Sequence, residues 1–221
     1  MGRREVWSQA KLGGIAFLMS GALYLTKSVL DFVVGDPPST RSEILVWRSS
    51  HEVSLAWTNE VLFAATVLLI PAVIALYRAL EGSSRAWVGA GCGTIAAIIP
   101  TLFAVLMVHG RLAFPIYGIT IDDPATAQLV VSLYYGGMHA VSLLLAGACV
   151  VLGLAMRRGM FGPVIGIVGV AAGAAQVAVA YPWLIAPGFI LMLQSVLALW
   201  FLLIGWRLAW PPHAPVVSTV S

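Results

Sequence analysis

Six long apolar stretches run through the chain and constrain its fold more than any other feature. A helix needs about 20 mostly apolar residues to cross about 30 Å of hydrocarbon. The stretches run from Leu12 to Val34, Leu55 to Tyr77, Trp87 to Val108, Leu129 to Leu154, Pro163 to Trp183 and Phe189 to Leu208. Each predicts one spanning helix, so residues 1–221 are expected to form a single integral membrane domain with short tails at both ends.

The composition supports a membrane domain and excludes several other classes of protein. Of 221 residues, 60% are hydrophobic and 10% are charged, whereas soluble chains carry about 25% charged residues. So few charges cannot cover a water-facing surface, which excludes a soluble enzyme and a disordered chain. The net charge of +3 comes from basic residues scattered singly, so no nucleic-acid partner is expected. Two cysteines, Cys92 and Cys149, are too few for a disulfide framework.

The basic residues lie mainly on one side of the predicted helices. Eight fall on the side of the termini, namely Arg3, Arg4, Lys11, Arg78, Arg85, Arg157, Arg158 and Arg207, and four fall toward the other side, namely Lys27, Arg41, Arg48 and Arg111. Cytoplasmic segments carry the excess of lysine and arginine. We therefore predict an all-α bundle of six transmembrane helices with both termini in the cytoplasm, multi-pass in a cell membrane, which we expect to be a bacterial inner membrane.

Two connections on the predicted outer side carry structural signals. The first, residues 35–54, contains the apolar piece Ile44 to Trp47 between charged residues. This piece is expected to lie in the interface plane or to dip back into the membrane. In the third connection, Asp122, Asp123 and Pro124 precede Thr126, a pattern that predicts a turn and the N-cap of the fourth helix.

The predicted fifth helix carries glycines at G-x-x-x-G spacing. They are Gly162 with Gly166, and Gly169 with Gly173. Small residues let two helix backbones approach closely in a membrane. The pattern indicates close packing inside the bundle, and a homo-oligomer interface through this helix is the alternative.

Soluble-enzyme motifs are missing from the sequence, so the polar residues within the spans carry the information about function. There is no P-loop, no G-x-S-x-G, no H-E-x-x-H and no C-x-x-C motif. No His and carboxylate group stands at metal-ligand spacing, so neither a metal nor a cofactor is expected. An ionisable group within a span is a candidate functional residue, because its desolvation is costly unless it is paired.

Four carboxyl and lysine residues stand out on the first two helices. Lys27 and Asp31 are four residues apart, so they share a helix face and can pair. The alternative is a lysine that extends to the outer interface of the membrane with Asp31 as a local counter-ion. Glu60 is predicted to lie inside the second span with Asn59 beside it, and Glu52 lies two turns earlier. A desolvated carboxyl group suits general-acid catalysis. The alternative for Glu60 is a structural hydrogen bond or ion pair within the bundle.

The predicted fourth helix shows a polar stripe. Its members, at spacings of three and four residues, are Gln128, Ser132, Tyr135, His139 and Ser142. A polar face on a spanning helix must contact protein or a wet cavity, because lipid offers it no hydrogen bonds. His139 is therefore expected to be a proton carrier or a hydrogen-bonded core residue, and less readily a metal ligand.

With the predicted orientation, the polar and aromatic candidates fall in the outer half of the bundle. The candidates for substrate binding are Trp57, Asn59, His109, Arg111, Tyr134, Tyr135, Gln176, Tyr181, Trp183 and Gln194. The cytoplasmic half consists mostly of Leu, Val, Ala and Gly. This segregation predicts one polar and aromatic cavity that opens outward or laterally to lipid and is closed at the cytoplasmic end.

Two resemblances to known families extend this interpretation. Arg157-Arg158-Gly159, the glycine-rich helix, the segment from Trp200 to Gly205 and Arg207 resemble the layout of small actinobacterial six-helix membrane proteins of unknown function. In size, in hydropathy and in the carboxyl group of Glu60 within a span, the chain also resembles the membrane-bound terpene cyclases of meroterpenoid and indole-terpenoid pathways. The second resemblance implies an acid-initiated cyclisation that uses carboxylic acids within or beside the spanning helices.

The leading hypothesis from the sequence is a membrane-embedded enzyme acting on a lipophilic small molecule, most concretely an acid-initiated, metal-free isoprenoid cyclase. Glu60 would donate the first proton, Asp31 or Glu52 would be the second carboxyl group, and His139 would take the final proton. The aromatic candidates would stabilise carbocations. The alternatives are a small transporter or lipid-binding protein that uses the same cavity without chemistry, and an accessory subunit of a larger complex. Membrane lipids are expected partners in every case.

Overall fold

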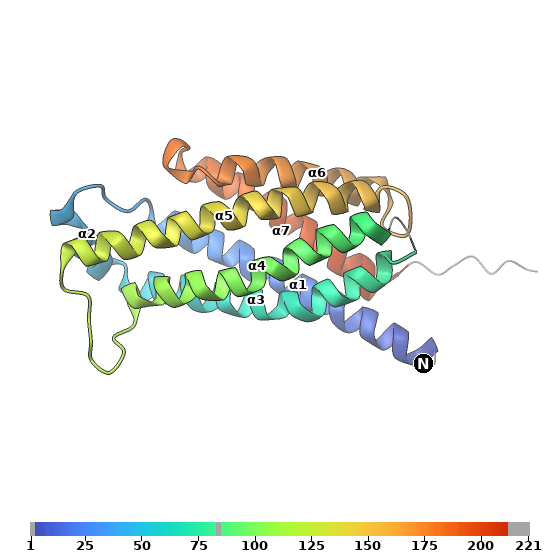
Figure 1. The fold of residues 1–221 in the computed structure, drawn as a ribbon, viewed down its shortest axis with the longest axis horizontal. Helices are drawn as coiled ribbons and strands as arrows, with labels where there is room; N and C mark the ends of the chain where they lie inside the picture. Colours follow the sequence, from blue (N-terminus) through green and yellow to red (C-terminus); the bar gives the residue numbers. More distant parts are fainter. Residues whose placement is uncertain (1–2, 83–84, 212–221) are drawn as a thin grey trace, which may run out of the picture.

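The computed structural model describes residues 3–82 and 85–211, and in these ranges the chain is helical apart from its connections (Figure 1). The elements are α1 (Arg3–Val34), α2 (Arg41–Ser50), α3 (Glu52–Leu80), α4 (Arg85–Ala113), α5 (Pro124–Met156), α6 (Gly162–Val179), the 3₁₀ turn η1 (Pro182–Leu184) and α7 (Pro187–Ala209). No strand occurs in the described part of the chain, where Ile116 and Ile119 form an isolated β-bridge. The predicted all-α architecture is confirmed.

Six of these helices are long and apolar enough to cross a membrane, as expected for a multi-pass membrane protein. They are α1, from Gln9 onward, and α3, α4, α5, α6 and α7. The predicted spans match these helices, with one clear difference. The fifth span was predicted to run to Trp183, but α6 ends at Val179. Pro182 has no amide hydrogen and disfavours the helical conformation of the residue before it, so the chain turns there instead.

The six long helices form a closed ring. Along it, α1 packs against α3, α3 against α4, α4 against α5, α5 against α6, α6 against α7, and α7 returns to α1. The start of α1 and the end of α7 lie on the same side of the bundle, which we call the termini end (Figure 1). The opposite side, which we call the α2 end, carries α2 and the loop between α4 and α5.

Polar and apolar side chains divide the interior of the bundle along its length. The termini half is packed with large apolar side chains that are fully buried, including Phe17, Leu76, Leu152, Met156 and Trp200. The indole nitrogen of Trp200 donates a hydrogen bond to the carbonyl oxygen of Ile165, 3.1 Å away. In the described part of the chain, the buried polar side chains lie in the middle of the bundle or toward its α2 end, and they are Ser20, Lys27, Ser28, Thr58, Asn59, Thr66, His109, Ser142, Gln176 and Gln194. The predicted segregation of polar residues is therefore confirmed.

The glycines of α6 pack against α5 within the chain. A Cβ atom added to Gly166 would lie 2.6 Å from the carbonyl oxygen of Gly153, and one added to Gly173 would lie 2.7 Å from that of Ala146. Gly162 differs from the others, because it starts the helix at a φ of +79° and an added Cβ atom would meet nothing within 4 Å. Close packing inside the bundle is thus confirmed for the inner glycines. The homo-oligomer through α6 stays a prediction, and it would need a face of α6 that α5 does not cover.

Helix α2 is held against the bundle by protein contacts. Ile44 is buried and packs with Leu112, Ile121 and their neighbours. The guanidinium of Arg48 donates hydrogen bonds to the carbonyl oxygens of Leu112 (2.6 Å) and Ile121 (2.8 Å). The apolar piece predicted in this connection therefore belongs to a short helix that packs on α4 and α5 through Ile44, whereas Val46 of the same piece is exposed.

The predicted N-cap of α5 is also confirmed. The Asp123 carboxylate accepts hydrogen bonds from the hydroxyl (2.7 Å) and the backbone amide (2.8 Å) of Thr126. These bonds favour the ionised form and lower the pKa of Asp123. When the pH is above the usual range of a carboxyl pKa, the ionised cap therefore stabilises the start of α5. This stabilisation is lost as the pH falls through the lowered pKa of Asp123.

Candidate functional site

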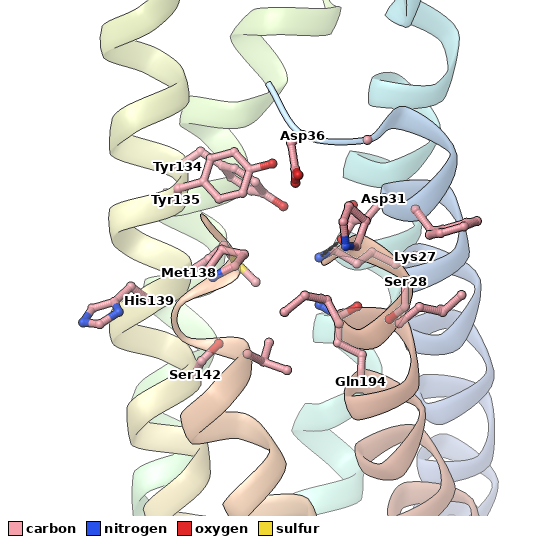
Figure 2. A pocket seen from close by; sticks show the side chains of 17 residues that line it. Lys27, Ser28, Asp31, Asp36, Tyr134, Tyr135, Met138, His139, Ser142 and Gln194 are labelled. Atoms are coloured by element: carbon pink, nitrogen blue, oxygen red, sulfur yellow. Dashed lines mark ion pairs between the residues drawn. The ribbon is translucent and has the colours of Figure 1, made fainter. Parts of the chain in front are cut away.

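A cavity of about 80 Å³ lies between α1, α5 and α7 at the α2 end of the bundle (Figure 2). It exists because α6 is short. At 1.5 Å per residue the 18 residues of α6 span about 27 Å, against about 50 Å for the 33 residues of α5. Helix α6 therefore leaves the wall between α5 and α7 incomplete near the α2 end, and the turn after α6 visibly stops short of that end (Figure 1).

An ion pair between Lys27 and Asp31 forms one wall of the cavity (Figure 2). The residues are one helical turn apart on α1, as predicted, and the Lys27 side chain is 3% exposed while that of Asp31 is 34% exposed. Asp31 is thus the local counter-ion of Lys27, but the Lys27 side chain is buried and does not extend to the surface of the bundle. An ammonium group removed from water needs a counter-charge, and Asp31 supplies it.

Two tyrosines of α5 form the opposite wall and face the ion pair (Figure 2). The buried ring of Tyr134 lies close to Lys27 and 5.2 Å from the ring of Tyr135, in edge-to-face geometry. Both tyrosines were predicted to bind a substrate, and both line the cavity. Their hydroxyl groups add hydrogen-bonding capacity beside the charged pair.

His109 packs against the ring of Tyr134, and Asn59 in turn contacts His109. Nδ1 of His109 lies 3.2 Å from Oδ1 of Asn59, and the His109 ring is 4.2 Å from that of Tyr134. Neither residue lines the main cavity. His109 instead borders a smaller cavity of about 30 Å³, together with Asp31 and the buried Thr58, whose hydroxyl has no hydrogen-bond partner among the described residues.

His139 lies at the edge of the main cavity and connects it to the turn after α6. Its Nδ1–H donates to the carbonyl oxygen of Ala180, 2.8 Å away, which leaves Nε2 as an acceptor. The rings of Tyr181 and Trp183 lie 5.0 Å and 6.0 Å from the imidazole. These two aromatic residues were predicted to line the cavity, but they form an exposed cluster outside it.

The inner end of the cavity is polar and uncharged. Ser142 continues the predicted α5 stripe inward, and Gln194 of α7 reaches the cavity with an amide oxygen that has no partner in the described part of the chain. Gln176 of α6 is also buried, but it lies deeper and lines a separate space. Three further lining residues, Ser28, Met138 and Asp36, were not predicted. Helical spacing could have identified two of them, because Ser28 stands three residues before Asp31 and Met138 stands four residues before Ser142.

The structure does not bring the predicted acids of α3 to this site. Glu60 is exposed on the outer face of α3 and is not among the residues that line the cavity. Trp57 lies on the same face and is 61% exposed, and Glu52 is exposed in the first turn of α3. The predicted convergence of Asp31, Tyr135 and His139 is observed, but its extension to Glu60, Glu52 and Trp57 is wrong.

Arg111 also lies outside the cavity and contacts the loop between α4 and α5. Its guanidinium donates hydrogen bonds to the carbonyl oxygens of Phe114 (3.3 Å) and Ile119 (3.0 Å), so it shapes the loop between α4 and α5. The prediction that Arg111 lines the cavity is therefore wrong, because Arg111 is not among the lining residues. Within residues 3–82 and 85–211, no group of three His, Cys, Asp or Glu side chains is arranged to hold a metal ion.

Comparison with known proteins gives no independent assignment of this site. The chain matches no protein-family model, no curated protein and no solved structure. The interpretation of the cavity therefore depends on its own geometry: a buried ion pair, two tyrosines and a histidine around a space that is open where α6 ends.

Proposed function

We propose that this membrane protein binds an amphiphilic, lipid-like molecule by its polar end in the cavity between α1, α5 and α7. The observation that carries the proposal is the Lys27–Asp31 ion pair, which lines a cavity beside an incomplete helix wall. A buried ion pair is weak evidence for stability, and an ionisable residue within a spanning segment is a candidate functional residue. The cavity combines this pair with an opening that a lipophilic molecule can use.

The size of the cavity favours a polar head group as the buried part of the ligand. About 80 Å³ holds a few atoms or several water molecules, but it does not enclose a whole lipid. The remaining lining residues are apolar and include Phe32 of α1 and Ile190 and Leu191 of α7. An apolar tail would pass over these residues into the lipid beside the bundle.

The charges around the cavity favour an uncharged, oxygen-bearing head group. The ammonium of Lys27 is balanced by Asp31, and Asp36 adds a further negative charge at the mouth. An anionic phosphate would be repelled there. A hydroxyl, carbonyl or epoxide oxygen would instead accept a hydrogen bond from Lys27 or from a tyrosine.

The second candidate is an enzyme acting on the same kind of molecule, including the isoprenoid cyclase expected from the sequence. It is favoured by the two tyrosine rings beside a carboxylate, an arrangement that suits a carbocation. An acid-initiated reaction, however, needs a carboxylic acid in the cavity. Glu60 lies elsewhere, and the carboxyl group of Asp31 is engaged in its ion pair with Lys27. Binding without chemistry is therefore the better-supported function. If the purified protein formed a cyclised product from an isoprenoid epoxide, catalysis would become the better-supported function instead.

The replacement of Lys27 by methionine tests the binding proposal. The variant keeps the length and apolar body of the side chain but removes its donor, and Asp31 can still reach water. A hydrogen bond from a charged group contributes about 1.5–3 kcal/mol, so the Kd should rise about ten- to hundredfold. Binding of radiolabelled farnesol to the purified protein measures this change.

The matched control is Lys11→Met, which removes an exposed lysine on the same helix and should leave the Kd unchanged. Dodecyl phosphate serves as an anionic probe of similar length. Tighter binding of dodecyl phosphate than of farnesol would contradict the uncharged head group. Equal farnesol binding by the wild type and Lys27→Met would contradict the site itself.

We also propose that the α2 end faces outward and that both termini lie in the cytoplasm, as the distribution of basic residues predicts. Single cysteines at Ser39, in the connection before α2, and at Gly82, after α3, test the orientation, because both positions are exposed. Cys92 and Cys149 are buried and should give little background. A membrane-impermeant thiol reagent added to intact cells should label Ser39→Cys and not Gly82→Cys. The opposite pattern would reverse the orientation.

A further inference from the structure

A second cavity of about 30 Å³ lies deeper in the bundle than the first. It is in the middle of the membrane-spanning region, since Thr66, one of its lining residues, is the central residue of α3 (Glu52–Leu80). The polar side chains on its walls are Ser20, Tyr24, Thr66, Ser142 and Gln176. Ser142 and Met138 line both cavities, so these two residues form the boundary between the outer and the inner space.

The amide of Gln176 in the inner cavity lacks a protein partner. The side chain is 0% exposed, and neither its nitrogen nor its oxygen makes a hydrogen bond to any described residue. Tyr24 lies next to the amide without forming a bond of normal geometry. An unpaired buried polar group costs about 1–3 kcal/mol, so two such atoms in one amide point to a ligand from outside the chain.

The neighbouring hydroxyl groups do not satisfy this amide. Ser20 donates to the carbonyl oxygen of Ala65 (3.0 Å), and Thr66 donates to that of Leu62 (2.7 Å). Each hydroxyl keeps its oxygen as an acceptor that faces the same space. On the other side of the boundary, the buried amide oxygen of Gln194 also lacks a partner among the described residues. Unsatisfied amides therefore lie both in the outer cavity and in the inner one.

The inner cavity has no polar continuation toward the termini end. The next layer of the core contains Phe17, Leu76, Leu152 and Trp200, whose side chains are fully buried and apolar. An internal water molecule needs two to four polar partners. This layer offers almost none, so a polar path from the α2 end must stop in the middle of the bundle.

We infer that the outer cavity continues past Met138 and Ser142 as a hydrated path, and that it ends at an inner site where Gln176, Tyr24 and Ser20 bind water. A water molecule occupies about 10–15 Å³ by this measure of volume, so the inner cavity of about 30 Å³ holds about two. Water then reaches the middle of the membrane from one side only. The inference requires the outer cavity but no particular ligand, so it can hold even if farnesol and its analogues do not bind.

Hydroxyl-radical labelling of the protein in lipid nanodiscs tests this inference, because bound internal water delivers radicals to adjacent side chains. Met138, at the boundary, and Tyr24, in the inner cavity, should be oxidised several-fold faster than Met156. Met156 is the reference for a dry environment, since it is fully buried in the apolar half, whereas Met138 and Tyr24 are partly buried. Labelling of Met138 and Tyr24 at the level of Met156 would show that the interior is dry and would overturn the inference.

The replacement of Gln176 by leucine gives a second, independent measurement. Leucine has a similar volume but cannot bind water, so oxidation of Tyr24 should fall while that of Met138 stays at the wild-type level. The melting temperature should stay the same or decrease, because the amide of the wild type is satisfied by water. An increase in melting temperature would show that the amide had been unsatisfied, since removing such a group is stabilising, and would also overturn the inference.

Discussion

Replacement of Asp31 by asparagine should lower the free energy of unfolding by about 3 kcal/mol, the lower end of the range for a broken buried ion pair. Asparagine keeps the size of the side chain but removes its charge. The ammonium of Lys27, whose side chain is 3% exposed, then loses its ion-pair partner. Asp31 is itself one-third exposed, so water moderates the loss. Unfolding of the purified protein by titration with SDS in mixed micelles measures the effect.

Two variants separate the effect of the charge from other effects of this substitution. Asp36→Asn removes an exposed carboxylate at the mouth of the same cavity and should leave stability unchanged. The double variant Lys27→Met with Asp31→Asn removes both charges and should recover most of the loss, because no ion is left buried. A stability of Asp31→Asn equal to that of Asp36→Asn would show that the pair does not stabilise the bundle.

Sequence patterns predicted which segments cross the membrane and which residues pair locally. The length and hydropathy of a span depend on its own residues, so all six were predictable. The Lys27–Asp31 pair and the face shared by Tyr135 and His139 were also predictable, because each follows from helical spacing within one segment. The early end of α6 could have been predicted from Pro182, which stands inside the predicted span.

The direction in which a single polar residue faces was not predictable from hydropathy alone. Asn59 and Glu60 are adjacent in α3 and therefore point about 100° apart. Packing of α3 against α4 gives Asn59 a partner in His109 and leaves Glu60 on the outer face. One signal was available: the bulky residues Trp57 and Phe63 stand three positions on either side of Glu60 and share its face. Helix–helix interfaces in membranes are enriched in small residues, so a face with bulky apolar residues is expected to point to lipid.

Contacts between helices distant in sequence determine the cavity, and these contacts were the least predictable part of the site. The inner space depends on α1, α5, α6 and α7 lying at set distances around Ser142 and Gln176. Glycine positions control these distances. Gly14 and Gly205 bring the backbones of α1 and α7 together, and α1 in turn carries Lys27 and Asp31. The geometry of the site therefore depends on a contact near the opposite end of the same helix.

Replacement of Gly205 by valine should have the second large effect, because it forces α1 and α7 apart. A Cβ atom at this position would lie 2.7 Å from the carbonyl oxygen of Gly14 and 2.7 Å from the backbone nitrogen of Leu18. Both are backbone atoms, so a change of side-chain rotamer cannot relieve the clash. Overpacking of this kind costs about 1–3 kcal/mol or more, and we expect the upper part of this range together with weaker farnesol binding.

Gly147→Val is the matched control for this prediction. Gly147 is also inside a helix, but it is exposed on α5 and an added Cβ atom meets nothing within 4 Å. Its replacement should leave the melting temperature in detergent nearly unchanged, and farnesol binding should match that of the wild type. If Gly205→Val melted and bound like Gly147→Val, the close contact between α1 and α7 would not hold the cavity in shape. If Gly205→Val lost stability but bound farnesol like the wild type, the effect of Gly205 would be confined to the termini half. The site near Lys27 would then not depend on the contact between α1 and α7.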